Sequence, residues 1–155
     1  MEVLHGRCRQ GDQALAVLSM RGWFSERSPE LRAALTRIAR VRDYAAGEPL
    51  YLHGDVPDGL YALVSGGLDL AIPRADGLEI TAHRADPGYW IGDLALISGQ
   101  TRLVSVVAAT PSRVVHVPNR PLEKLLDTEP RFYKEFYALT YANFSLTLRL
   151  LANLT

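Results

Sequence analysis

Glycine is unevenly distributed along this chain, and its distribution limits what the chain can fold into. Nine of the 12 glycines fall between positions 47 and 99. Glycine accepts the backbone angles that tight turns require, so this stretch is expected to turn often. The flanking stretches instead space their apolar residues three and four apart, as helices do. The sequence therefore predicts N-terminal helices over 1–40, a β segment over 41–118 and C-terminal helices over 119–155, all within one domain.

Between its turns, the middle segment alternates apolar and polar residues with period two. Leu68, Leu70 and Ile72 are predicted to share one face of a strand. Two further sets repeat the pattern, Leu78, Ile80 and Ala82, and Val104, Val106 and Ala108. Short strands separated by turns at intervals of about 8–12 residues favour an antiparallel barrel or sandwich. The segment shows no strand–helix–strand alternation, which argues against a doubly wound nucleotide-binding fold.

Helix starts are marked in both flanking segments. Ser28, Asn119 and Thr128 are each followed by a proline within two residues, which is typical of a capping residue and the first helical turn. An additional short helix is predicted around residues 14–18. The helix that starts after Thr128 is the longest of these.

This longest helix carries two apolar stripes. The first has the spacing of a coiled-coil seam and comprises Phe132, Phe136, Leu139, Asn143, Leu146 and Leu150. The second comprises Tyr133, Tyr137, Tyr141, Phe144, Leu148 and Leu151. A helix that is apolar on two sides needs two surfaces to pack against. We expect one to be the β segment and the other a second copy of the helix joined through the seam, where Asn143 either fixes the register or points at the barrel or solvent.

Composition excludes several classes of protein. The 155 residues include 17 Lys plus Arg and 17 Asp plus Glu, so the chain has no net charge to attract nucleic acid. No apolar run is long enough for a membrane span, and the N-terminus lacks the apolar core of a secretory signal. The single cysteine, Cys8, cannot form an internal disulfide or an iron–sulfur site. These features predict a cytoplasmic protein.

Residues 88–102 form the most specific local pattern. If Asp93 begins a short helix, its neighbouring N–H groups offer an anion site beside a carboxylate. Arg102, nine residues later, would supply a guanidinium fork for a phosphate. This combination suits a ribose phosphate. Two structural alternatives remain, in which Arg102 forms a salt bridge to Asp93 or a neighbouring acid and Asp93 merely caps the helix.

Three stretches, 47–51, 54–67 and 92–102, resemble the cyclic-nucleotide-binding domain. With the long helix, the closest resemblance is to the sensor half of Crp/Fnr regulators, the catabolite-activator and fumarate–nitrate family, over roughly residues 24–152. It implies an antiparallel, jelly-roll-like β-roll with a phosphate-binding cassette near 88–104 and a C-terminal dimerisation helix. It also implies cyclic AMP or cyclic GMP as effector, no required cofactor, and allosteric transmission to a DNA-binding domain.

The resemblance implies roles for individual residues and also shows departures. Ribose and phosphate contacts would fall to Gly92, Asp93, Leu94, Arg102, Leu103 and Val104, and the base would face Asn143 and Thr147. The family usually has glutamate where this chain has Asp93, whose carboxylate is drawn back by about 1.5 Å. It usually has a small hydroxyl residue and alanine in place of Leu103 and Val104, and a lost hydrogen bond to a charged group costs about 1.5–3 kcal/mol.

The function predicted is therefore the effector-sensing and dimerisation domain of a Crp/Fnr-type regulator, with no catalytic or metal-binding residues. One alternative is an effector-independent dimerisation module or stand-alone regulatory domain, in which Leu103 and Val104 fill the phosphate site. A small-barrel metal protein or enzyme is a second, although the sequence has no His-X-His pair. No helix-turn-helix pattern follows the long helix, so we expect the chain to be the sensor half of a longer regulator that contacts DNA through another domain.

Overall fold

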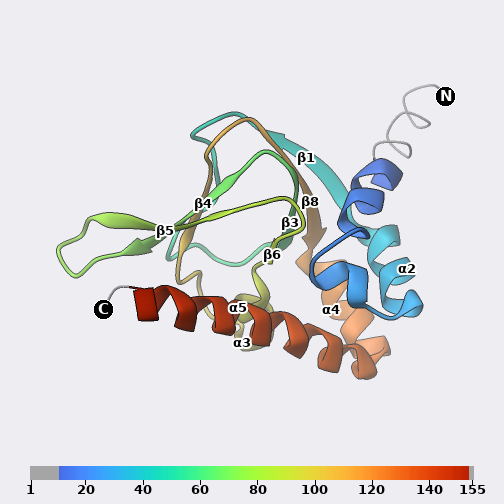
Figure 1. The fold of residues 1–155 in the computed structure, drawn as a ribbon. Coiled ribbons are helices and arrows are strands. Elements are labelled where there is room, and N and C mark those ends of the chain that lie inside the picture. The colour runs from blue at the N-terminus through green and yellow to red at the C-terminus, as the bar shows by residue number, and fades with distance from the viewer. Residues whose placement is uncertain (1–10, 154–155) are drawn as a thin grey trace.

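Eight antiparallel strands form a β-roll of two sheets, as a computed structural model that describes residues 11–153 shows (Figure 1). One sheet has the order β1-β8-β3-β6 and the other β2-β7-β4-β5. The strands are β1 (Arg40–Tyr44), β2 (Pro49–Tyr51), β3 (Gly59–Ser65), β4 (Leu68–Pro73), β5 (Glu79–Ala85), β6 (Trp90–Ile91), β7 (Ser105–Ala108) and β8 (Ser112–Pro118). The predicted antiparallel roll is confirmed. Cys8 lies outside the described residues.

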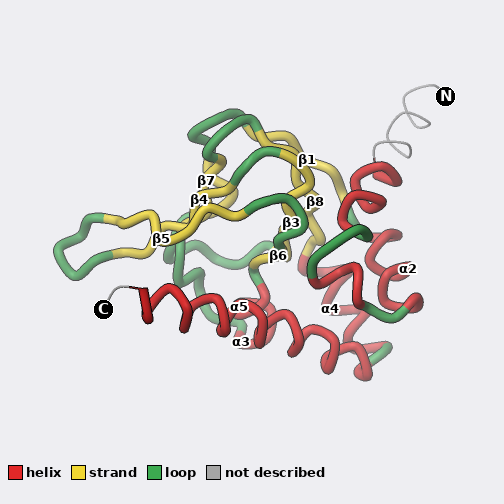
Figure 2. Tube along the Cα trace, viewed as in Figure 1, coloured by secondary structure: helices red, strands yellow, loops and turns green. Residues whose placement is uncertain are grey.

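Helices flank the strands at both ends of the chain, as predicted, and the N-terminal helices, α4 and the start of α5 gather on one side of the roll (Figure 2). Residues 11–18 are helical and are followed by η1 (Trp23–Glu26), α2 (Pro29–Ile38), α3 (Asp93–Ser98), α4 (Asn119–Thr128), η2 (Pro130–Phe132) and α5 (Tyr133–Asn153). The cap at Ser28 is confirmed, since its Oγ accepts from the Leu31 N–H at 3.2 Å. The cap at Asn119 is wrong, because its amide instead donates to the Pro57 carbonyl at 2.7 Å. Within the described part of the chain, no helix has the length and hydropathy to cross a membrane.

An aromatic cluster joins the N-terminal helices to the roll and to α5. The Trp90 ring lies 5.2 Å from the Trp23 ring and 5.6 Å from the Phe24 ring, measured between centroids. The Trp23 ring lies 5.1 Å from that of Phe136 in α5. Such contacts bury large apolar areas and favour a fixed geometry. The first turn of α5 is thereby held against both the N-terminal segment and strand β6.

Glu135, also in the first turn of α5, binds the start of α2. Its carboxylate accepts from the Ser28 backbone N–H at 2.7 Å and from the Ser28 hydroxyl at 2.9 Å. Its backbone carbonyl accepts from the Trp23 indole N–H at 2.7 Å. A carboxylate at a helix N-terminus satisfies exposed N–H donors and the helix dipole. The N-terminal end of α5 therefore has both polar and apolar anchors.

The prediction of the dimer seam is wrong at its N-terminal half. Phe132, Phe136 and Leu139 are buried in the chain's own core. Asn143 donates to groups of this same chain, whereas Leu146 and Leu150 are half-buried. The stripe that faces solvent is the second one, Tyr133, Tyr137, Tyr141, Phe144, Leu148 and Leu151. The spacing identifies both stripes but does not tell which of them the core covers. The stripe with the tyrosines lies outside, where the tyrosine hydroxyls stay in water.

The predicted inner face of β4 is confirmed for its first half only. Leu68 is buried and Leu70 packs against the core, whereas Ile72 is 42% exposed. The pairing of β4 with β5 shifts register after Leu70, because β5 has an extra residue between Thr81 and His83. Leu78 and Ile80 are also exposed, because the β4–β5 hairpin projects beyond the roll (Figure 1).

We expect Phe136→Ala to cost about 3–5 kcal/mol in the free energy of unfolding, since it empties a fully buried site. Tyr137→Ala, at the adjacent and half-exposed position, should cost no more than about 0.5 kcal/mol. Urea unfolding of dilute protein measures both values. A larger loss for Tyr137→Ala would mean that the outer stripe, not the inner one, carries the core contacts.

Candidate functional site

Gly92 is the point around which the candidate site is built. It joins β6 to α3 with φ +108°, a conformation that favours glycine. A Cβ at this position would lie 2.9 Å from the Gly59 carbonyl oxygen and 3.0 Å from Nη1 of Arg102. The absence of a side chain therefore lets the Arg102 guanidinium pack directly against the turn that precedes Asp93.

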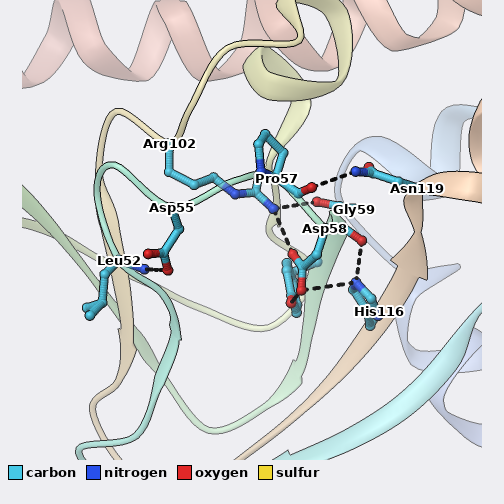
Figure 3. Close-up of polar contacts among 9 residues, drawn as sticks. Leu52, Asp55, Pro57, Asp58, Gly59, Arg102, His116 and Asn119 are labelled. Atoms are coloured by element: carbon cyan, nitrogen blue, oxygen red, sulfur yellow. Dashed lines mark hydrogen bonds and ion pairs between the residues drawn. The ribbon is translucent and has the colours of Figure 1, made fainter.

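The Arg102 side chain is folded into the protein. The residue is 4% exposed, and its Nη2 donates to Oδ1 of Asp58 at 3.0 Å and to the Gly59 carbonyl at 2.8 Å (Figure 3). The guanidinium carbon lies 3.9 Å from the centroid of the Tyr51 ring, a cation–π contact. Its Nε and Nη1 are buried and have no hydrogen-bond partner among the described residues. Arg102 thus keeps two donor nitrogens, Nε and Nη1, free.

The loop between β2 and β3 is fixed so that Asp58 faces Arg102. The Tyr61 hydroxyl donates to Oδ2 of Asp58 at 2.7 Å, and Nε2 of His116 lies 3.0 Å from the Asp58 carbonyl oxygen (Figure 3). The Asn119 amide holds the neighbouring Pro57 carbonyl. Asp58 is half-exposed, whereas Arg102 and His116 are buried. The ion pair therefore joins a buried guanidinium to a carboxylate that stays near water.

Burial shifts the pKa values of His116 and Tyr61, the two side chains that contact Asp58. Burial lowers the pKa of His116, and the Arg42 cation lowers it further, against the opposing effects of the Asp58 carboxylate and carbonyl. Burial also raises the pKa of Tyr61, as do its hydrogen bond to Asp58 and that carboxylate's charge. The imidazole is thus biased towards its neutral form and the phenol is held protonated.

Asp93 contacts helix α5 rather than capping α3. The residue is 2% exposed, its Oδ2 accepts from the Thr140 hydroxyl at 2.8 Å and its Oδ1 accepts from the Asn143 amide at 2.7 Å. The Asn143 amide also donates to the Trp90 carbonyl at 3.3 Å. Helix α3 does begin at Asp93, as predicted, but Gly92 precedes it with no side-chain cap. The expectation that Asp93 caps α3 is therefore wrong.

The remaining predicted site residues lie more outward. Leu94 is 54% exposed and Leu103 is 67% exposed. Val104 is half-buried and packs against buried apolar residues of the roll. Thr147 is exposed and its hydroxyl donates to the Asn143 carbonyl of its own helix. The expectation that Leu103 and Val104 together fill the site is wrong for Leu103. The alternative in which Arg102 forms a salt bridge is confirmed for a neighbouring acid, since its partner is Asp58 and not Asp93.

Sequence reasoning missed three residues that complete the site. Asp58 lies 44 residues before Arg102 in a turn-rich stretch, where an aspartate is expected for turn chemistry alone. Tyr51 was part of a recognised motif but carried no assigned role. Thr140 precedes Asn143 by three residues, so helical spacing places both on one face. That spacing is the one signal that could have identified Thr140.

The arrangement presents two complementary groups around Gly92. Asp93 offers a carboxylate that accepts from hydroxyl or amide donors, and Arg102 offers two unpartnered donor nitrogens suited to an anion. Within residues 11–153, no group of three or more His, Cys, Asp or Glu side chains is placed to hold a metal ion. The chemistry supported is recognition of a small molecule that carries both hydroxyls and negative charge.

Comparisons with known proteins find related sequences and a related fold. A family model for the cyclic nucleotide-binding domain matches residues 41–129. The CRP-like cAMP-activated global transcriptional regulator of Mycobacterium tuberculosis is 24% identical over 119 residues, which cover 77% of this chain and 53% of that protein. A cyclic nucleotide-gated potassium channel of Mesorhizobium japonicum is 26% identical over 113 residues, 73% of this chain and 30% of the channel. The chain spans about half or less of these relatives.

A solved structure shows the same fold. The catabolite activator protein of Thermus thermophilus superposes with a TM-score of 0.69 at 26% identity. The match covers 84% of this chain and 62% of that one.

We expect the stability of the protein to fall as the pH drops below about 6.5, partly through His116. Its pKa is lowered in the folded chain, so the unfolded chain takes up the proton first and acid favours unfolding. His116→Gln should reduce the loss of unfolding free energy between pH 7.5 and 5.5 by about 1 kcal/mol. Urea unfolding at both pH values measures it. The control His53→Gln, at an exposed position, should behave like the parent chain, and equal effects of the two substitutions would contradict the prediction.

Proposed function

Because a family model matches more than half of its length, the chain belongs to the cyclic nucleotide-binding domain family, and we propose that it senses a cyclic nucleotide within a Crp/Fnr-type regulator. The observation that carries this proposal is the pair of buried, unpartnered nitrogens of Arg102, Nε and Nη1, the second of which lies beside Gly92. Buried donors without partners are costly, and an anionic ligand would satisfy them. Cyclic AMP is the first effector to test and cyclic GMP the second.

The proposed contacts follow the positions of the charged groups. The cyclic phosphate would take the free donors of Arg102, and Asp93 would accept from a ribose hydroxyl. Asn143 already lies beside Asp93, which supports its placement near the ligand, and Thr147 lies one turn further along the helix. Leu103 provides no hydroxyl for the phosphate. Arg102 would therefore carry most of the phosphate recognition.

We further propose that a second copy of the chain covers the outer stripe of α5. Tyr137, Tyr141, Phe144, Leu148 and Leu151 are each more than half exposed. A continuous exposed apolar stripe on a helix of 21 residues is typical of an interface. Ligand-dependent movement of the paired helices would then pass to a DNA-binding domain outside this chain. Such a regulator would act in the cytoplasm without catalysis of its own.

Calorimetric titration with cyclic AMP and cyclic GMP tests the ligand. We expect Arg102→Ala to weaken binding about 10- to 150-fold, the equivalent of a hydrogen bond to a charged group. Arg113→Ala is the matched control, because Arg113 pairs with Asp43 at the surface of the roll. Absence of heat from the parent chain at millimolar nucleotide would contradict the proposal, as would equal binding by Arg102→Ala.

Sedimentation velocity tests the interface. We expect the parent chain to dimerise and Tyr141→Lys to sediment as a monomer, because the substitution places a charge in the middle of the outer stripe. Val56→Lys is the control. Val56 is 81% exposed and lies on the loop between β2 and β3, so it is not part of the outer stripe. A parent chain that stays monomeric at high concentration, or a dimer that survives Tyr141→Lys, would contradict this assignment.

A further inference from the structure

Helix α5 already occupies the carboxylate that the proposed ligand needs. Both oxygens of Asp93 accept hydrogen bonds from α5, one from the Thr140 hydroxyl and one from the Asn143 amide. We call these three residues the Asp93 cluster. A ribose hydroxyl has the same chemistry as the Thr140 hydroxyl, namely an O–H that donates to a carboxylate. The helix and the ligand therefore offer the same kind of donor to the same acceptor.

The C-terminal half of α5 has no buried side chain, so its hydrogen bonds to Asp93 matter for holding it in place. The buried side chains of α5 are Phe136 and Leu139, both in its first two turns. From residue 140 to 153 no side chain is buried, and Leu146 and Leu150 are half-buried. The Asp93 cluster follows directly after the last buried residue. Its hydrogen bonds to a buried carboxylate are stronger than neutral ones, so within a single copy of the chain they contribute much of what fixes this half of the helix.

We propose that Asp93 holds the C-terminal half of α5 against the cassette, and that a ligand hydroxyl bound at Asp93 displaces Thr140 and Asn143. The second part rests on the proposed function. Two helix donors leave the carboxylate as the single free ribose hydroxyl of a cyclic nucleotide arrives, and the released Thr140 and Asn143 groups return to water, so the exchange opposes ligand binding. Ligand binding and helix docking then compete for one acceptor, and each shifts the population of the other.

Hydrogen exchange of the ligand-free chain tests the first part. Thr140→Val removes the hydroxyl at nearly constant volume, and we expect the amides of residues 140–153 to exchange about tenfold faster. Thr140→Ser should restore the parent rates. Thr36→Val is the matched control, because its hydroxyl bonds only a carbonyl of its own helix, that of Arg32. Unchanged exchange in Thr140→Val, or faster exchange spread over the whole chain, would overturn the proposal.

Affinity for cyclic AMP tests the second part. Thr140→Val should bind about tenfold more tightly than the parent chain, because one competitor for Asp93 has been removed. A merely structural role for Thr140 predicts weaker binding instead, and that result would overturn the competition. If neither chain binds cyclic AMP or cyclic GMP, the proposed function and the competition both fail. The exchange rates of the ligand-free chain then still decide whether Asp93 holds α5.

Discussion

The buried charge of Arg102 is the constraint on which the rest of the site depends. A guanidinium taken out of water must be paired, or it costs several kcal/mol. Asp58 supplies the opposite charge and Tyr51 supplies a ring face. To place Asp58, the loop between β2 and β3 is held by Tyr61 and by other groups of the roll. To admit the guanidinium, the neighbouring turn must have glycine at position 92. One ion pair thus specifies the loop between β2 and β3 and the turn between β6 and α3.

Helix α5 is anchored unequally along its length, and this inequality connects the site to the rest of the molecule. Its first turn binds the N-terminal helices through Glu135 and joins the aromatic cluster through Phe136. Its second half has no buried side chain and reaches the roll through Asn143 and Thr140. A segment with few buried contacts opens at low free energy. A change at Asp93 therefore affects the C-terminal half of α5 while the first turn stays fixed.

The sequence predicted features that depend on local chemistry. Turn glycines, alternating strands and the cap at Ser28 are short-range signals, and the start of α3 at Asp93 follows from the same kind of signal. Long-range pairing was not predictable, because nothing near Arg102 in the chain points to an acid 44 residues away. The orientation of α5 was missed for a related reason. The two apolar stripes have similar spacing, and only tertiary packing decides which of them the roll covers.

The departures from the family pattern affect the ligand more than the fold. Leu103 points largely to solvent, so replacing a small hydroxyl residue there leaves the core unchanged. Arg102 keeps its buried position and its two free donors, which preserves the charge that a phosphate needs. A ligand at this site would meet fewer phosphate contacts than the family pattern provides, and it would also have to displace two donors from Asp93. Both effects lower the affinity expected of the proposed sensor for its effector without removing recognition.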